Sequence, residues 1–320
     1  MKAAVLHALG ERPRYEDVPD PVPQDGEQVV RVLACPLTNF DRAQSAGSHY
    51  SSTTIRLPSV CGDIAAGALA DGRHMLFGSV GGTMADLAVT APAWCSPIPE
   101  GIDVAVAAAI HNPGLSAGLA LQWRAALQPG ETVLVMGGTG VTGKVAIQLA
   151  KQLGAGRVVA SGRNPERLAS LAALGADAVV QLDRPDSEIR DDLRELGGEH
   201  GYDVILDYLW GHPTEILLEA LGTAHDMSLR FVRTRLLQVG VMAGPTISLP
   251  AKVLRASGLE IMGNGSGTAP PAELIESQLN SLMTLVAQGR LSIDVRRMPL
   301  AEVADAWDQD QKGRRTVLVP

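Results

Sequence analysis

Closely spaced glycines beside a lysine form a candidate phosphate-binding loop in the segment VLVMGGTGVTGKVAIQLAK, residues 133–151. Gly138, Gly140 and Gly143 have the spacing of a dinucleotide-binding loop. Gly138 and Gly143, followed by Lys144, also fit most of the P-loop of nucleoside triphosphatases. In both kinds of loop, backbone N–H groups and the positive end of the next helix bind a phosphate. The glycines therefore predict a phosphate site that could hold either a dinucleotide or a nucleoside triphosphate.

The residue after Lys144 favours the dinucleotide. A P-loop needs Ser or Thr there, because that hydroxyl holds Mg²⁺, and this chain has Val145. The segment VILD, ending at Asp207, resembles a Walker B strand, but so short a pattern arises often by chance. The loop follows a strand, opens a helix and belongs to a βαβ unit of about 30 residues, as a dinucleotide site requires. We expect it to bind a pyrophosphate; a tight turn without a ligand is the alternative.

The end of the next strand indicates which dinucleotide is bound. An NAD site usually places Asp or Glu about 20 residues after the loop, where it accepts from the ribose 2′-hydroxyl. Here that position is Arg163, and residues 157–165 contain no acid. Arg163 can make charge-assisted bonds to a 2′-phosphate, with Ser161 and Asn164 as neutral donors. This predicts NADP(H), unless Arg163 is only a solvated loop residue.

Two types of segment must position these residues. The first hundred residues contain short alternating strands separated by Pro and Gly, which predicts a mostly β domain. Strand and helix patterns then alternate from about residue 132 to residue 265, which predicts a parallel sheet. Between the two, Asn112 and Pro113 predict a helix start, because Asn is a good N-cap and Pro suits the first helical position; this helix would reach about Leu127. The tail returns to a helix and strands.

Composition limits the partners and the compartment. The 320 residues carry a formal net charge of -8, and no basic run is longer than two residues, which argues against nucleic acid and anionic membranes as partners. The three cysteines are far apart and form no CxxC pair, and residues 1–10 would make a poor signal peptide. Both features suit a reducing cytoplasm. The longest uncharged stretch, 104–123, is interrupted by His-Asn-Pro-Gly, which argues against a membrane span.

The chain resembles the zinc-independent quinone oxidoreductase branch of the medium-chain dehydrogenase/reductase family, which includes zeta-crystallin. The matching segments, in family order, are MKAAVLHALG, VLACPLTNFDRAQSAGSHY, GGTMADLAV, IPEGIDVAVAAAI, GLSAGLAL, the loop at 133–151, LQVGV and RRTVLVP. The resemblance implies an α/β protein with a GroES-like β-rich catalytic domain (1–111 and 265–320) and an inserted Rossmann domain (112–264). It also implies a homodimer formed through the Rossmann domains. The hairpin between GDIAAGALA and GRHMLFGS is shorter than in typical members.

The same resemblance indicates that zinc is absent. In zinc-dependent members a Cys three residues before an Asp, and a Gly-His-Glu, supply the ligands. The matching positions here are Thr38 before Asp41, and Gly62-Asp63-Ile64. A hydroxyl and an aliphatic side chain do not replace thiolate and carboxylate around Zn²⁺. Cys35 and Cys61 lie near these positions but out of register, and the cysteine-rich lobe for structural zinc is missing.

Site residues also follow from the resemblance. Asn39 and Tyr50 are the implied catalytic donors facing the nicotinamide, although Tyr50 can also be a loop aromatic at the cleft edge and Asn39 a residue that holds the turn. Asp41 is expected to brace the local backbone, and His49 is a weaker candidate proton source. The predicted coenzyme-binding residues lie in the loop, after the second strand and around the nicotinamide: Ser116, Gly137, Thr139, Gly140, Val141, Thr142, Gly143, Ser161, Arg163, Asn164, Gly240 and Asn264, with the backbone at 239–241 and 262–264.

The expected reaction is hydride transfer from NADPH. Without a Lewis acid, preorganised hydrogen-bond donors, worth roughly 2.7–4 kcal/mol each, must stabilise the charge on the acceptor oxygen. Such help suits quinones and α,β-unsaturated carbonyls, in which conjugation spreads the charge. The alternatives are a zinc-type alcohol dehydrogenase with unfamiliar ligands and a NADPH-binding protein with little turnover.

Overall fold

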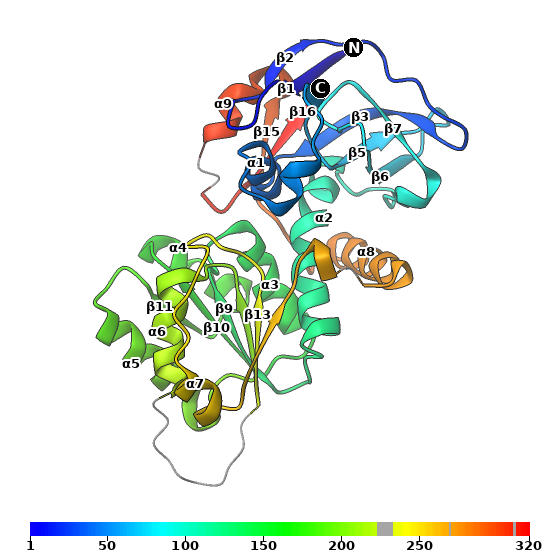
Figure 1. Cartoon of the computed structure of the whole chain (residues 1–320). Helices are drawn as coiled ribbons and strands as arrows, with labels where there is room; N and C mark the ends of the chain where they lie inside the picture. The colour runs from blue at the N-terminus through cyan, green and yellow to red at the C-terminus, as the bar shows by residue number, and fades with distance from the viewer. Residues whose placement is uncertain (223–232, 269, 310–311) are drawn as a thin grey trace. The chain divides into compact units, whose positions relative to one another are not determined.

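The chain forms two compact units. The computed structural model describes residues 1–222, 233–268, 270–309 and 312–320. The first unit comprises Met1–Asn112 and Leu279–Pro320, and the second comprises Pro113–Gln278 (Figure 1). The second unit is thus inserted between the two segments of the first. The sequence predicts limits after residues 111 and 264, whereas these units meet after residues 112 and 278.

The first unit is rich in β-structure. A three-stranded sheet has the order β2-β1-β4, and a seven-stranded sheet has the order β15-β16-β3-β5-β6-β8, with β7 also paired to β3. The last strand, β16, pairs antiparallel with β3, with Leu318 opposite Cys35, so the end of the chain forms part of the seven-stranded sheet. The strands are β1 Lys2–Leu6, β2 Arg14–Asp17, β3 Gln28–Pro36, β4 Ser59–Val60, β5 Ile64–Ala68, β6 His74–Gly78, β7 Leu87–Thr90, β8 Cys95–Pro97, β15 Val295–Pro299 and β16 Arg315–Val319.

Short helices connect these strands: α1 Asn39–Ser45, η1 Tyr50–Thr54, η2 Pro92–Trp94, η7 Leu300–Glu302 and α9 Val303–Asp308. The alternating strand residues point inward to one core, in which Leu6, Phe77 and Leu318 are almost fully buried. α1 follows the end of β3, and η1 follows α1. These two elements carry the residues expected to face an acceptor.

The second unit is a doubly wound parallel sheet. Its order is β11-β10-β9-β12-β13-β14 with every pair parallel, and helices cover both faces (Figure 1). The predicted fold class is therefore confirmed. The elements are β9 Thr132–Met136, α3 Val141–Gln152, β10 Arg157–Gly162, α4 Pro165–Ala169, η4 Ala172–Leu174, β11 Ala178–Gln181, α5 Asp186–Gly197, η5 Gly198–His200, β12 Val204–Asp207, α6 Gly211–Gly222, β13 Thr234–Gln238, α7 Ala251–Ala256, β14 Leu259–Gly263 and η6 Ser266–Thr268.

Two longer helices run across the limits of the units, α2 Val104–Leu119 and α8 Ala272–Ala287. The expectation that a helix starts at Asn112 is wrong, because α2 begins at Val104 and contains Pro113. The Oδ1 atom of Asp103 caps it, accepting from the N–H of Ala105 at 2.9 Å. The alanine-rich run after this cap has high helix propensity, and its burial outweighs the single backbone bond lost at Pro113.

α2 continues into a π-helical turn, Ala120–Arg124. By length and composition, Val104–Arg124 could cross a membrane. However, 61% of the most apolar 18-residue stretch of this helix is buried inside the protein, so packing in the core accounts for its apolar composition.

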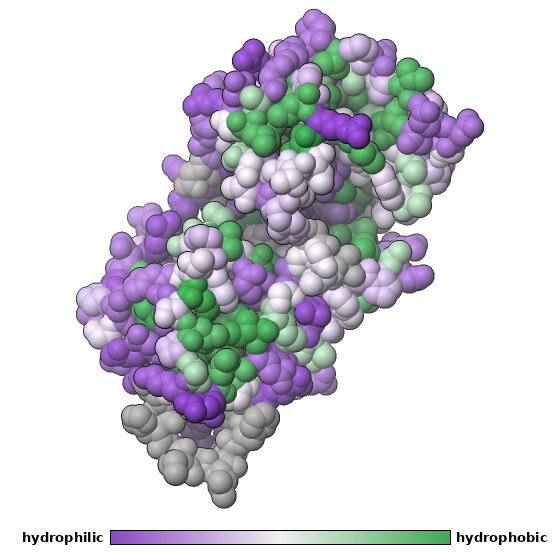
Figure 2. Space-filling model, viewed as in Figure 1, coloured by the Kyte–Doolittle hydropathy of each residue, from purple (hydrophilic) through white to green (hydrophobic). Residues whose placement is uncertain are grey.

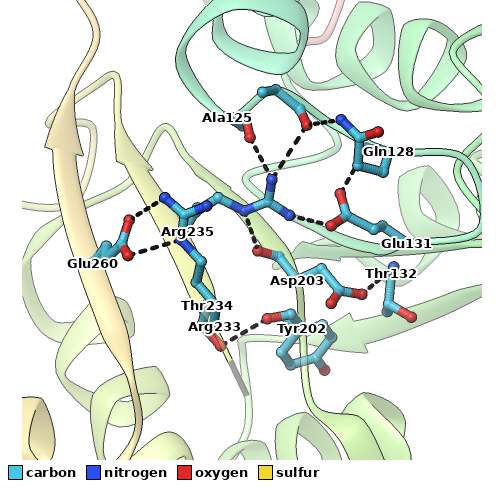
Figure 3. A network of polar contacts seen from close by, with 11 residues as sticks. Ala125, Gln128, Glu131, Thr132, Tyr202, Asp203, Arg233, Thr234, Arg235 and Glu260 are labelled. Atoms are coloured by element: carbon cyan, nitrogen blue, oxygen red, sulfur yellow. Dashed lines mark hydrogen bonds and ion pairs between the residues drawn. The ribbon is translucent and has the colours of Figure 1, made fainter. Parts of the chain in front are cut away.

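A buried arginine ties together the amino-terminal ends of the second unit's strands (Figure 3). Arg235 of β13 donates to the Glu131 carboxylate at 2.5 Å, to the Ala126 carbonyl at 3.3 Å and to the Ala125 carbonyl. Its Nε also donates to the Asp203 carbonyl at 3.3 Å. One side chain thus connects β13 to the end of the π-helical turn, to the residue before β9 and to the residue before β12.

Candidate functional site

The glycine-rich loop lies at the carboxyl end of β9, against β10. Gly137 has a φ of +87°, a conformation that L side chains rarely adopt. Its N–H points to the Oγ atom of Ser161 at 3.2 Å, and the next N–H, of Gly138, donates to the Ser161 carbonyl at 2.7 Å. The turn is therefore anchored to the end of β10 before any ligand arrives.

Gly143 closes the turn from the first turn of α3. A Cβ atom on Gly143 would lie 2.7 Å from the Cα of Gly138, and closer still to the carbonyl oxygen of Gly137. Both neighbours are backbone atoms, so they cannot rotate away. Only glycine lets the helix start this close to the strand, and that approach aims the helix end at the turn.

The amides at the start of α3 are left for a ligand. The N-cap residue, Gly140, has no side chain to accept from them, so the first-turn N–H groups of Val141, Thr142 and Gly143 have no side-chain cap. A helix start with these donors binds anions, and this cradle fits a pyrophosphate. The hydroxyls of Thr139 and Thr142 lie in the same short segment.

The position in the sheet agrees with a nucleotide site. Counting outward from β9, the chain builds β10 and β11 on one side and then returns to build β12, β13 and β14 on the other. Ligands of doubly wound sheets bind at the carboxyl ends of the strands beside this reversal. The glycine-rich loop follows β9, directly at the reversal.

Asp207, the acid of the Walker B-like segment, is fully occupied by its own turn. It is completely buried, and its carboxylate accepts from Leu209 N at 2.8 Å, Trp210 N at 3.0 Å and the Thr214 hydroxyl at 2.6 Å. Burial raises its pKa above the ordinary range in spite of these bonds. Asp207 therefore holds the turn from β12 to α6, and it is not available as the Mg²⁺-binding acid that the triphosphatase interpretation would assign to it.

The three residues predicted to recognise a 2′-phosphate have different surroundings. Ser161 is fully buried, and its hydroxyl contacts the loop N–H and Met136 Sδ at 3.4 Å, so it supports the loop from below. Asn164 is the N-cap of α4, and its Oδ1 atom accepts from Arg167 N at 2.9 Å. This cap does not use the Nδ2 group, which can donate to a ligand. Arg163 is exposed, and within the described part of the chain its guanidinium makes no hydrogen bond or ion pair. Of the three residues, Arg163 is therefore the one whose charged group can bind an anionic ligand.

The residues expected around the nicotinamide converge at the carboxyl ends of β13 and β14. Asn264 N donates to the Gln238 carbonyl at 2.9 Å, and Asn264 Nδ2 donates to the Ser116 carbonyl at 3.3 Å. Gln238 Nε2 in turn donates to the Gly240 carbonyl at 3.0 Å. A Cβ atom on Gly240 would lie 2.7 Å from the Tyr208 carbonyl, so glycine permits this approach to β12. The sequence did not single out Gln238, although it joins these segments.

In the first unit, Thr38 and Asp41 form a capping box at the start of α1. Thr38 N and Oγ1 both donate to Asp41 Oδ2, at 2.7 and 2.5 Å, and Asp41 N donates back to Thr38 Oγ1 at 3.1 Å. Burial raises the pKa of Asp41 to about 6, against the effect of these bonds. The expectation that Asp41 braces the backbone is confirmed.

Asn39 and Tyr50 lie at the starts of α1 and η1, and both are exposed. Tyr50 is 66% exposed, and its ring contacts the His49 ring with centroids 4.0 Å apart. Phe40, next to Asn39, meets the same imidazole edge to face at 4.9 Å. The chain contains few aromatic residues, so this cluster gives the α1–η1 segment an unusual aromatic surface.

The donor set near Thr38 does not fit a zinc site. In the described ranges, no group of three His, Cys, Asp or Glu side chains could hold a metal ion. Cys35 and Cys61 are buried, and burial raises the pKa of the Cys35 thiol and brings that of Cys61 to about 12. The Cys35 thiol donates to the Thr83 carbonyl at 2.8 Å, so it is used within the core of the first unit.

Comparison with known proteins gives matches along the whole chain. Residues 141–280 match the family model described as "Zinc-binding dehydrogenase". The chain is 26% identical to "Probable NADPH-dependent quinone reductase tdiC" of Emericella nidulans, over 96% of both chains. It is 30% identical to "Quinone oxidoreductase-like protein 2" of Bos taurus, over 66% of this chain and 58% of the bovine one. The solved quinone oxidoreductase of Thermus thermophilus, whose structure includes a complex with NADPH, is 28% identical over the full length of both chains, with a TM-score of 0.83.

Proposed function

Since the chain belongs to the quinone oxidoreductase type of the medium-chain dehydrogenase/reductase family, we propose that it reduces a quinone or an α,β-unsaturated carbonyl with NADPH and without zinc. The observation that carries this proposal is the uncapped start of α3, which Gly143 brings against Gly137, together with the exposed Arg163 directly after β10, the strand next to β9. Two relatives support it: the E. nidulans protein is described as a probable NADPH-dependent quinone reductase, and the T. thermophilus quinone oxidoreductase was solved in complex with NADPH.

The second unit holds the coenzyme in this proposal. The amides of Val141, Thr142 and Gly143 bind the pyrophosphate, and Arg163 pairs with the 2′-phosphate. Ser116, Gly240 and Asn264 line the nicotinamide side. When bound, NADPH supplies the hydride, and the chain's own task is to orient the acceptor and stabilise the charge that develops on its oxygen.

Residues of the first unit stabilise the acceptor oxygen. Asn39 and Tyr50 carry an amide and a phenol at the exposed starts of α1 and η1, and both groups can donate to an oxygen anion. Two such donors are a modest aid compared with a metal ion. Such donors suit acceptors in which conjugation already spreads the charge.

No step passes through zinc. The matched family model describes zinc-binding dehydrogenases, but the residues here differ from a zinc donor set. The Thr38 hydroxyl is bonded within its capping box, and Ile64 offers no ligand atom.

One assay tests the function. Purified protein is expected to oxidise NADPH when a quinone or an enone is added, at the same rate before and after dialysis against a metal chelator. Elemental analysis of the active protein is expected to give no stoichiometric zinc. Activity that disappears on dialysis and returns only with added zinc would instead establish a zinc-type dehydrogenase.

Arg163→Ala is expected to weaken NADPH binding by about 10- to 100-fold, because a charge-assisted hydrogen bond is worth roughly 1.5–3 kcal/mol. Binding of NADH, which lacks the 2′-phosphate, should hardly change. Titrations of both coenzymes by fluorescence measure this. Arg157→Ala removes the same charge at the opposite end of β10 and serves as the control. Equal losses for NADPH and NADH at position 163 would count against 2′-phosphate recognition.

We also propose a cytoplasmic homodimer formed through the second unit. β14 is an edge strand of the parallel sheet. Large apolar residues of the second unit are exposed, including Val241 and Met242 after β13 and Leu254 of α7. Figure 2 shows an apolar area on the same unit. The free cysteines Cys35 and Cys61 suit a reducing compartment.

A further inference from the structure

The imidazole of His49 is held at one of its two nitrogens. Ser51 N donates to His49 Nδ1 at 3.2 Å, and Ser51 Oγ lies 2.8 Å from the same atom. Gln44 Nε2 donates to Ser51 Oγ at 3.2 Å, which leaves the hydroxyl proton of Ser51 for the ring. A ring nitrogen that accepts from a backbone N–H carries no proton, so the neutral ring is protonated at Nε2. His49 therefore presents Nε2–H as a donor.

Two aromatic rings fix the orientation of this donor. The Phe40 ring meets the imidazole at an interplanar angle of 78°, and the Tyr50 ring lies against it at 36°. Contacts of this kind favour particular ring arrangements over others. The ring is half-buried, and among the described residues its hydrogen bonds are made at Nδ1, not at Nε2.

The supporting residues also join the two elements that carry the expected acceptor donors. Ser52 Oγ donates to the Gln44 carbonyl at 2.9 Å, and His49 N donates to the Ala43 carbonyl at 3.2 Å. α1, which begins with Asn39, and η1, which begins with Tyr50, are thereby fastened at the position of His49. A donor fixed in this way needs little reorganisation when charge develops nearby, which is the requirement for transition-state stabilisation.

We propose that His49 is a further catalytic residue, whose Nε2–H donates a hydrogen bond to the acceptor oxygen as negative charge grows there. Ser51 and Gln44 are positioning residues that hold the ring in this tautomer. This inference rests on the proposed function. The acceptor takes one hydride, two electrons and one hydrogen nucleus, from the coenzyme and one proton from water. His49 keeps its own proton throughout.

Two substitutions separate this role from a structural one. His49→Asn keeps a side-chain oxygen to cap Ser51 N but loses the ring, and His49→Phe keeps the ring but loses both nitrogens. Both are expected to lower kcat by about 10- to 100-fold, somewhat less than the loss of one oxyanion donor from a metal-free site. NADPH affinity, set by the second unit, should stay unchanged, and circular dichroism should confirm folding.

Rates with a series of acceptors distinguish a catalytic role of His49 from a purely structural one. The loss in kcat at position 49 should grow from strongly electrophilic quinones to weakly electrophilic enones, because the latter depend more on the donated hydrogen bond. Ser51→Ala should lower kcat several-fold with little change in acceptor KM. It should add almost nothing to His49→Phe, since both act through one ring.

His74→Phe is the matched control, because His74 is an exposed histidine on β6 of the same unit and is expected to keep wild-type rates. Full activity of His49→Asn, or one constant factor of loss across all acceptors, would overturn the role of His49 and leave the proposed function standing. A wild-type protein that reduces no acceptor would overturn both.

Discussion

Gly143→Ala is expected to raise the NADPH dissociation constant by about 10- to 100-fold. The added methyl group would lie 2.7 Å from the Cα of Gly138 and closer to the Gly137 carbonyl oxygen, so the helix start must move away from the strand. Overpacking of this kind costs about 1–3 kcal/mol, and the displaced amides no longer converge on a phosphate. Fluorescence titration with NADPH measures the loss, and thermal unfolding measures the accompanying decrease in stability.

Gly140→Ala is the control in the same loop. Gly140 has a φ of -76°, and its added Cβ would have only an ordinary contact of 3.4 Å with the Gly137 carbonyl oxygen. The free protein should therefore unfold at the wild-type temperature. A Gly143→Ala protein with unchanged NADPH affinity would show that the coenzyme does not bind at this loop.

Arg235→Met is expected to lower the free energy of unfolding by about 3–5 kcal/mol, the usual result of removing one partner of a buried ion pair. The Arg235 side chain is only 6% exposed, and its loss removes the donor to Glu131 Oε1 and to the Ala125 carbonyl (Figure 3). Gln128 continues to donate to Glu131 Oε2 and to the Ala126 carbonyl, but the largely buried charge of Glu131 loses its partner. Chemical denaturation of the coenzyme-free protein measures the change. NADPH affinity under native conditions should hold, because this network lies at the opposite ends of the strands from the loop.

Arg233→Met is the matched control two residues earlier. Arg233 pairs with Glu260 through two bonds of 2.8 Å, but both side chains are exposed (Figure 3). Water and salt screen such a pair, so its removal should have a far smaller effect. In the double variant Arg235→Met/Glu131→Gln, part of the lost stability should return, because no unpaired charge remains. Equal stability of the two single variants would mean that burial adds nothing at Arg235.

The sequence and the structure differ most clearly along α2. Local preferences placed a helix start at Asn112 and Pro113, yet the helix begins at Val104 and passes through the proline. Burial of the alanine-rich run and the cap from Asp103 outweigh the single bond lost there. Ser161 also has a role that the sequence did not predict, because its hydroxyl accepts from Gly137 N and supports the loop from within the core.

By itself, the sequence determined the alternation of strands and helices, the glycine-rich loop and the absence of an acid near Arg163, because each of these is a pattern among residues close together in the chain. Only the tertiary structure decided how side chains are used. Arg235 is buried by partners more than one hundred residues away, Ala125 and Glu131, and the Asn264 amide donates to the carbonyl of the similarly distant Ser116. Burial and partner geometry follow from the folded arrangement, and no local spacing encodes them.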